Sequence, residues 1–390
     1  MINYDLIYVL LSAVLTFLFP LFAIPVNLLG VVFFKKTRKV SIVLLALSFA
    51  LVAYAWNPPV LADLYRHHTE MSVLKKYDFA RLIEYSFREL NFLQVFTEFL
   101  VSKTGDYDLL QLLVTFVGYY EIFWMICNYA EKKEIRNTAI GLALVLAIVS
   151  LKFIDFASGL WFFFAIINLV LGLYLRHFNN TKKLHWLFYA LALLSHVSVL
   201  FILVVVLLSD VLKSFKKASW LSLVVLFVVF STIGFILNYL CTHFDFYFLT
   251  VLQKMYQSYF VGSRFSGIVL GWNLYTAIIS IAFGVLVTII SRRVEKTDYN
   301  SLILLVSVSV LALILQSGIF TRFAIMILFM SLIPLMDIMN AKQLNRKKFL
   351  VALCFCLVAG LNTYRQIEQI VEYRLISTTV DSYFKEGDEL

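Results

Sequence analysis

Long apolar runs separated by short polar clusters are repeated along most of the chain. Runs such as 221–236 and 278–290 are continuous, without the alternation of apolar and polar residues that is typical of strands in a transmembrane barrel. About 20 apolar residues cross the hydrocarbon layer as a helix, and backbone groups in lipid need partners within their own segment. The pattern therefore predicts an all-α polytopic membrane protein.

We predict about 12 transmembrane helices in a single integral-membrane domain, since no internal repeat and no soluble domain is evident. The predicted spans are 6–34, 40–56, 109–130, 138–151, 156–175, 184–195, 197–208, 220–240, 267–290, 301–315, 323–340 and 349–363. The segment 184–208 has basic clusters at both ends, so it is predicted to enter and return as a re-entrant or broken pair.

Composition supports a membrane location for the whole chain. Of the 390 residues, 62% are hydrophobic and 15% are charged, whereas soluble domains are about half apolar and a quarter charged. The first run, 6–34, lacks a basic start and is too long for the apolar part of a signal peptide, so it is expected to stay as the first span. The four cysteines offer neither a disulfide framework nor a zinc-ligand spacing.

The net charge of +9 is concentrated in short connections between the apolar runs. These connections are 35–39, 131–136, 176–183, 213–217, 291–296 and 342–348. The excess of lysine and arginine on the cytoplasmic side of membrane proteins predicts that all six are cytoplasmic. The N-terminus, the loops 57–106 and 241–266 and the tail 364–390 are then extracytoplasmic.

The large outer loop contains an amphipathic helical pattern that begins at Phe79. Its apolar stripe is formed by Leu82, Ile83, Phe87 and Leu90, and its charged stripe by Arg81, Glu84 and Arg88. Such a helix is expected to lie flat on the outer membrane surface.

Polar residues that could carry chemistry follow Asn57 closely in the sequence. Within six positions the chain places Asp63, Tyr65, Arg66, His67 and His68. Adjacent histidines on one short stretch rarely supply a closed set of ligands, so no metal site is predicted.

Two further arginines, Arg264 and Arg322, lie at the predicted outer ends of spans. Each alone could simply extend its long side chain into the lipid headgroups. Together with Arg66 and Arg88 they could form an anion site, because a guanidinium group matches two phosphate oxygens. His196, at the predicted turn of the broken pair, is either a hydrogen-bonded core histidine or a functional group.

Several short motifs follow one another in a characteristic order. They are Asn57-Pro58, Asp63-Leu64-Tyr65-Arg66-His67, Glu89-Leu90-Asn91-Phe92, Gly105-Asp106-Tyr107, Ser195-His196-Val197-Ser198 and Arg322-Phe323. In this order and spacing the chain resembles the Wzy-type polysaccharide polymerases of the EpsG-like group. Two positions depart from that group: Leu90-Asn91 replaces Pro-Gly, and the arginine expected near the start of the central block is absent.

The resemblance implies a membrane glycosyltransferase that polymerises capsular or exopolysaccharide repeat units on the outer face of the bacterial cytoplasmic membrane. Its expected substrates are undecaprenyl-diphosphate-linked oligosaccharide and the growing glycan. The bilayer, a flippase and a chain-length regulator are expected partners, and neither nucleic acid nor a cofactor is expected. In the implied reaction a sugar hydroxyl of one unit attacks the anomeric carbon of the chain, and the lipid diphosphate leaves.

This reaction requires a carboxylate near the attacking hydroxyl and cations near the diphosphate. Asp63 or Glu89 is predicted to be the general base, and His196 is a further predicted catalytic residue. The residues predicted to bind the diphosphate or the substrate are Tyr65, Arg66, His67, Arg88, Arg264 and Arg322.

Two other functions share some of these features. A ligase that transfers finished glycan to another acceptor would use the same lipid-linked donor, and the identity of the acceptor would distinguish it. A flippase for the lipid-linked oligosaccharide should carry charges in a central cavity, whereas the predicted spans are almost free of charge.

Overall fold

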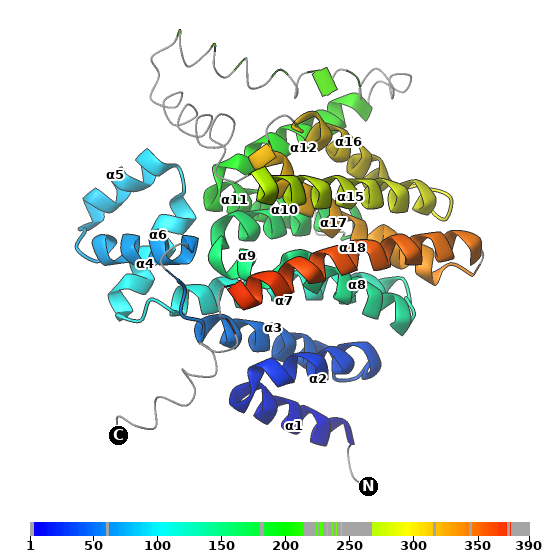
Figure 1. The fold of residues 1–390 in the computed structure, drawn as a ribbon, viewed down its shortest axis with the longest axis horizontal. Coiled ribbons are helices and arrows are strands. Elements are labelled where there is room, and N and C mark those ends of the chain that lie inside the picture. The colour runs from blue at the N-terminus through cyan, green and yellow to red at the C-terminus, as the bar shows by residue number, and fades with distance from the viewer. Residues whose placement is uncertain are drawn as a thin grey trace. The chain divides into compact units, whose positions relative to one another are not determined.

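The computed structural model describes residues 4–59, 62–179, 183–213, 267–314, 317–342 and 345–372, with isolated helical positions between 224 and 243 and at 375. All regular elements within these ranges are helices (Figure 1). The chain divides into two compact units, the first formed by residues 1–87, 91–196 and 362–390 and the second by residues 88–90 and 197–361. The prediction of a helical protein is confirmed for the described residues.

The first unit contains the helices of the N-terminal half of the chain, together with the end of the last helix. Its helices are α1 (Tyr4–Leu18), α2 (Pro20–Phe33), α3 (Arg38–Tyr54), α4 (Asp63–Leu74), α5 (Phe79–Glu89), α6 (Phe92–Thr104), α7 (Leu109–Lys132), α8 (Asn137–Leu151), α9 (Phe153–Ser158), α10 (Leu160–Phe178) and α11 (Leu184–Ser195). In this unit α3 packs against α2 and α7, and α10 packs against α7 and α11.

The second unit contains the 3₁₀ turn η1 (Val197–Val199) and four further helices. They are α12 (Leu200–Lys213), α15 (Gly267–Ser291), α16 (Asp298–Ala312) and α17 (Ser317–Asn340). Here α15 packs against α16 and α17, while α12 packs against α16. The last helix, α18 (Asn345–Glu372), passes from the second unit into the first after Leu361.

Five helices among the described residues are long and apolar enough to cross a membrane. They are Leu109–Lys132, Leu160–Phe178, Asn273–Ser291, Phe320–Asn340 and Asn345–Glu372. Each coincides with a predicted span, and shorter apolar helices occupy most of the other predicted ranges. The chain is therefore described as a helical membrane protein, while the number of about 12 spans stays a prediction. The predicted loop 241–266 lies outside the described residues.

The first apolar run is folded into two helices, so the prediction of one span over 6–34 is wrong. The helix stops at Leu18, and the next begins at Pro20, which occupies its first position. Proline lacks an N–H group and pushes the preceding residue out of the helical region, and Phe19 accordingly has φ −141° and ψ 66°.

The two helices form an antiparallel pair. The Tyr8 hydroxyl donates to the Val26 carbonyl at 3.1 Å, and the Tyr8 ring stacks on Phe34 with centroids 4.5 Å apart. Asp5 and Lys36 approach within 3.9 Å. The N-terminal end of α1 thus lies beside the basic connection 35–39, so the prediction that these segments are on opposite faces is also wrong.

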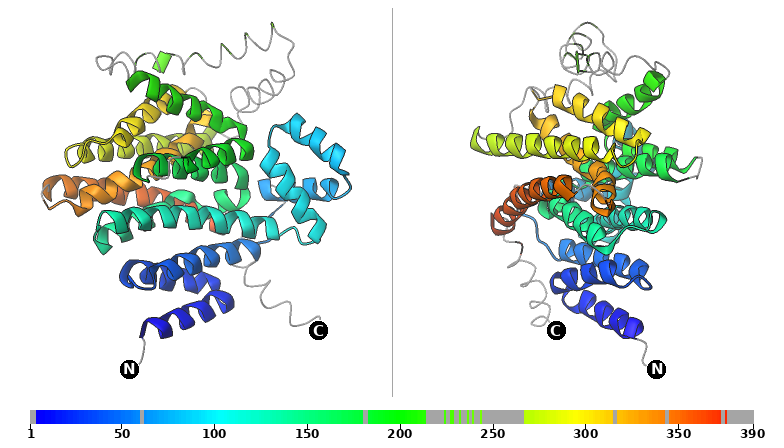
Figure 2. Two further views of the ribbon diagram at one scale, coloured as in Figure 1. Left: turned by 180° about the vertical axis from the view of Figure 1, so that it is seen from behind. Right: turned by 90° about the vertical axis from the view of Figure 1, so that its right-hand side faces the viewer.

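A buried polar cluster joins α1, α2 and α3. The Asn27 amide donates to Thr16 Oγ1 at 2.9 Å and to Ser48 Oγ at 3.0 Å. An amide buried among apolar residues needs such partners, because an unsatisfied polar group costs about 1–3 kcal/mol. The three helices lie side by side as a result (Figures 1 and 2).

The predicted outer loop is largely helical and folds as its own cluster of α4, α5 and α6 (Figures 1 and 2). Leu74, Leu82 and Val95, one from each helix, form its apolar core. The interfacial helix of the prediction is α5, but its apolar stripe is divided. Leu82 is buried in the core, whereas Ile83 and Phe87 are exposed.

The predicted break in the segment 184–208 is present. Helix α11 ends at Ser195, and His196 has the extended backbone angles φ −158° and ψ 113°. That the chain returns to the same membrane face stays a prediction.

Helix α18 continues to Glu372, beyond the end of the predicted span 349–363, and the extracytoplasmic location of the tail 364–390 stays a prediction. Gln366 donates to the carbonyls of Ile148 and Val149, each at 3.0 Å, and Gln369 donates to Asp155 at 2.6 Å. These bonds tie the end of α18 to α8 and α9 and stabilise the extra turns.

Candidate functional site around helix α4

Helix α4 carries the predicted Asp63–His67 element and presents its residues to different surroundings. Asp63, Tyr65 and Arg66 are exposed, whereas His67 is buried. Successive residues on a helix are about 100° apart, so neighbours in sequence face different partners. The helix therefore separates the predicted site into an outward group and an inward group.

The inward group centres on one carboxylate oxygen. Glu98 Oε1 accepts a hydrogen bond from Trp161 Nε1 at 2.9 Å, and His67 Nδ1 lies at the same distance of 2.9 Å from this oxygen. The three side chains belong to α6, α10 and α4, and they are 1%, 4% and 3% exposed, respectively. We call this set the Glu98 cluster.

The Glu98 cluster links three helices through one buried carboxylate. A buried carboxylate requires polar partners, and the two nitrogens beside it come from helices other than its own. These two contacts therefore contribute to the packing of α4 near α6 and α10.

Glu70 extends the cluster toward the surface. Its carboxylate lies 3.7 Å from Arg66 Nε and 3.8 Å from His67 Nδ1. His67, Glu70 and Glu98 each offer one ligand atom, and these three atoms lie within 4.8 Å of one another. One imidazole and two carboxylates are residue types that suit a divalent cation. Since the same Glu98 oxygen already contacts the Trp161 and His67 nitrogens, the geometry is equally explained without an ion, and the absence of a metal site stays a prediction.

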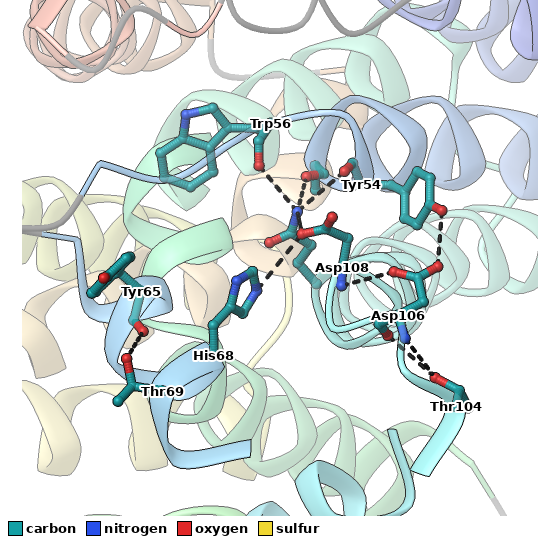
Figure 3. Close-up of polar contacts among 10 residues, drawn as sticks. Tyr54, Trp56, Tyr65, His68, Thr69, Thr104, Asp106 and Asp108 are labelled. Carbon is teal, nitrogen blue, oxygen red and sulfur yellow. Dashed lines mark hydrogen bonds and ion pairs between the residues drawn. The ribbon is translucent and has the colours of Figure 1, made fainter. Parts of the chain in front are cut away.

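A second polar network lies on another side of α4 (Figure 3). His68 Nε2 is 3.7 Å from Asp108 Oδ1, and the Asp108 backbone N–H donates to Asp106 Oδ1 at 3.1 Å. The Tyr54 hydroxyl donates to the other Asp106 oxygen at 2.9 Å. Gln111 donates to Asp108 at 3.4 Å and to the Ala53 carbonyl at 2.6 Å, which links α7 to the end of α3.

This network changes the acidity of two of its members. Burial, followed by the adjacent carboxylate of Asp106, raises the pKa of Asp108 to about 6. Burial, followed by the charge of His67, lowers the pKa of His68, while Asp106 and Glu98 act in the opposite direction. Groups whose pKa values are shifted by burial and by neighbouring charges are common at functional sites.

Replacement of Asp108 by Asn should change the pH dependence of stability. The folded-state pKa lies above the unfolded value of 3.8, so the wild-type protein should lose stability as the pH rises from about 4 to about 6. Because the Asp108 side chain is 46% exposed, solvent screening should limit this loss to about 1 kcal/mol. Chemical unfolding of both proteins between pH 4 and pH 7.5 tests this, and parallel curves would contradict it.

The sequence of helix α4 lies within a match to a known protein family. The model of the EpsG family matches residues 61–375. This match covers most of the chain and begins just before Asp63. The chain belongs to the EpsG family. The resemblance inferred from the motifs is thereby confirmed, and neither a curated protein nor a solved structure matches the chain.

Membership of the EpsG family supports a role of the polysaccharide-polymerase type and gives context to the remaining predicted residues. Glu89 lies at the end of α5, where its Oε1 is 3.3 Å from Arg88 Nε. Leu90, which follows Glu89, has a φ of +54°. A branched residue rarely adopts this left-handed conformation, so the turn after Glu89 is strained relative to one containing glycine.

The other predicted residues of this EpsG-family chain lie on later helices. The His196 ring is half-buried and meets Phe162 edge to face, with centroids 5.4 Å apart. Arg322 is half-buried in the second turn of α17. Arg264 lies outside the described residues. The roles of these three residues stay predictions.

Some polar residues were missed by the sequence analysis although they carried a signal. Glu98 occurs within the apolar stretch 92–101, and a charged residue in such a helix is usually buried against a partner. Glu121 lies in the middle of α7 and is only 8% exposed, so it is a buried polar residue within a predicted span. Trp161 had no such signal, because its partner is 63 residues away.

Proposed function

We propose that this EpsG-family protein joins undecaprenyl-diphosphate-linked oligosaccharide repeat units into a polysaccharide on the outer face of the cytoplasmic membrane. The observation that carries the proposal is the family match over residues 61–375, which includes the Asp63–His67 element on an exposed helix. Five apolar helices of membrane-spanning length support a location in the bilayer, where a polyprenyl carrier resides.

In the proposed reaction, one bond forms and one bond breaks at the same anomeric carbon. The acceptor hydroxyl oxygen forms a bond to this carbon, and the bond from the carbon to the diphosphate oxygen breaks. The hydroxyl proton goes to a base, and the diphosphate leaves with the bonding electrons. Asp63 or Glu89 takes the proton in this proposal, since each is a carboxylate that is not fully buried.

Cationic residues act on the leaving diphosphate in the same proposal. Arg66, Arg264 and Arg322 stabilise the charge that develops on its oxygens, because a guanidinium donates two hydrogen bonds in a fixed plane. Tyr65, His67 and Arg88 belong to the substrate-binding region. His196 assists catalysis from the break between α11 and η1.

Arg264→Lys and Arg322→Lys test the proposal against simple anchoring in the headgroups. Lysine keeps the charge and the long stem, so an anchoring role should survive, whereas the bidentate grip on a diphosphate should be lost. We expect at least about a tenfold loss of turnover, with accumulation of single lipid-linked repeat units at normal expression.

Arg81→Lys provides the matched control, because Arg81 is exposed on α5 and has no role in the proposed reaction. Lipid-linked intermediates extracted from cells would be separated by length and compared between variants. Wild-type chain lengths in both Arg264→Lys and Arg322→Lys would leave only the anchoring role.

A further inference from the structure

A cavity of about 150 Å³ lies between α4 and α5. It is lined by Thr69, Glu70, Val73 and Leu74 of α4, by Tyr77 and by Tyr85 of α5. We propose that this cavity binds one sugar ring of the lipid-linked oligosaccharide. The inference rests on the proposed function and names the part of the substrate that this site holds.

The walls of the cavity match the two kinds of surface that a pyranose ring presents. Tyr77 and Tyr85 meet at an interplanar angle of 80° with centroids 5.9 Å apart, and together with the side chains of Val73 and Leu74 they offer an apolar corner. A sugar places its C–H face against such aromatic surfaces. Its hydroxyl groups then require polar partners.

Those partners come from one wall. Thr69 and Glu70 are adjacent on α4, and Val73 follows one turn later on the same face. The Thr69 hydroxyl donates to the Tyr65 carbonyl at 3.0 Å, so its oxygen can accept a hydrogen bond from a ligand. The carboxylate of Glu70 can accept from a sugar hydroxyl, and such charge-assisted hydrogen bonds are stronger than neutral ones.

The size of the cavity limits the ligand to a single ring. Sites for drug-sized ligands measure about 300–1,000 Å³, which is at least twice as large. One monosaccharide residue fits this space, while the rest of an oligosaccharide would extend over the surface.

Other small ligands match the cavity less well. A phosphate would lie against the Glu70 carboxylate and be repelled. A quaternary ammonium group would need ring faces that point at a common centre, but the two tyrosine rings contact each other edge to face. Glu70 also lies 3.7 Å from Arg66, whose positive charge opposes that of the carboxylate. A neutral polyol is therefore the favoured class of ligand.

The cavity is near the residues proposed for the reaction. Glu70 follows Arg66 by four positions, which is one helical turn or about 6 Å along the axis. A sugar held here would bring the oligosaccharide to the same helix that carries Asp63 and Arg66. Binding at this site therefore positions the substrate without taking part in the chemical step.

Binding can be tested on the purified full-length protein in lipid nanodiscs. The probe is the free repeat-unit oligosaccharide, released from the host's lipid-linked pool by mild acid. Saturation-transfer NMR should show contacts to one sugar residue of this probe. Tyr77→Ala and Tyr85→Ala should each weaken binding at least about tenfold, whereas Tyr77→Phe and Tyr85→Phe should retain it, because the ring surface remains.

Phe79→Ala is the matched control, since Phe79 is an exposed aromatic residue on α5 that does not line the cavity. Unchanged affinity in both alanine variants, equal weakening by Phe79→Ala, or competition by choline chloride would overturn the sugar site. Chain extension by the wild type separates this result from the proposed function. If the wild type binds the probe through Tyr77 and Tyr85 but extends no lipid-linked chain, the sugar site stands and the proposed function falls.

Discussion

Asp63→Asn and Glu89→Gln are expected to differ in their effects on polymer synthesis. Loss of the general base should lower turnover about 100-fold or more while lipid-linked substrate still binds. Loss of the other carboxylate should reduce substrate binding or have little effect. Both replacements keep the size and hydrogen-bonding shape of the side chain, so they remove the charge with little change in packing.

Asp63 and Glu89 have different surroundings in the structure. Asp63 is exposed in the first turn of α4, where the free N–H groups of a helix favour a negative charge. Glu89 is half-buried beside Arg88 and precedes the left-handed residue Leu90. A base must accept a proton from a hydroxyl within hydrogen-bonding distance, and a carboxylate paired with arginine has one oxygen already engaged.

The measurement is polymerisation of lipid-linked repeat units by purified protein, together with binding of the same substrate. Glu84→Gln is the control, because Glu84 is an exposed acidic residue on α5 without a proposed role. Full polymer synthesis by both the Asp63 and the Glu89 variant would remove carboxylate catalysis at these positions. Equal losses of turnover with retained binding would contradict the assignment of a single base.

Glu98→Ala should destabilise the cluster of α4, α5 and α6 by about 3–5 kcal/mol, the range found when one partner of a buried charged pair is removed. The change would leave His67 and the Trp161 N–H buried without their shared acceptor. A cavity would also remain where the side chain had been. Glu98→Gln should cost less, because its amide oxygen can still accept the hydrogen bond from Trp161.

Trp161→Phe completes the test by removing one donor and keeping most of the ring. We expect a loss of about 1–3 kcal/mol for this variant, and less than additive losses when it is combined with Glu98→Ala, because both changes remove the same hydrogen bond. Hydrogen exchange of the α4–α6 amides measures the local stability. Wild-type protection in Glu98→Ala, or a similar loss in the exposed control Glu84→Ala, would show that the Glu98 cluster does not hold these helices.

The sequence by itself determined that this protein is a membrane protein and that its secondary structure is helical. Continuous apolar runs can be stable in lipid only as helices, and the five long helices coincide with predicted spans. The order of short motifs from Asp63 to Arg322 was sufficient to identify the family. The order and spacing of motifs can be read from the sequence without knowing which residues contact one another.

The tertiary structure decided which polar residues meet. His67 and His68 are adjacent in sequence, yet one contacts Glu98 and the other Asp108, because the helix turns about 100° per residue. Glu98 and Trp161 are 63 residues apart, and only the packing of α6 near α10 brings them to 2.9 Å. The pattern of apolar residues along the sequence predicts which residues are buried, but not which residues they contact.

In the run 6–34, a proline breaks the helix that the apolar pattern predicts. The run 6–34 has enough apolar residues for a single span, but Pro20 ends the helix, and the chain turns back so that Asn27 reaches Thr16 and Ser48. A proline signals a break, whereas the direction after the break depends on which helices can satisfy the polar groups exposed there. That choice is made by tertiary contacts and is absent from the periodicity of the sequence.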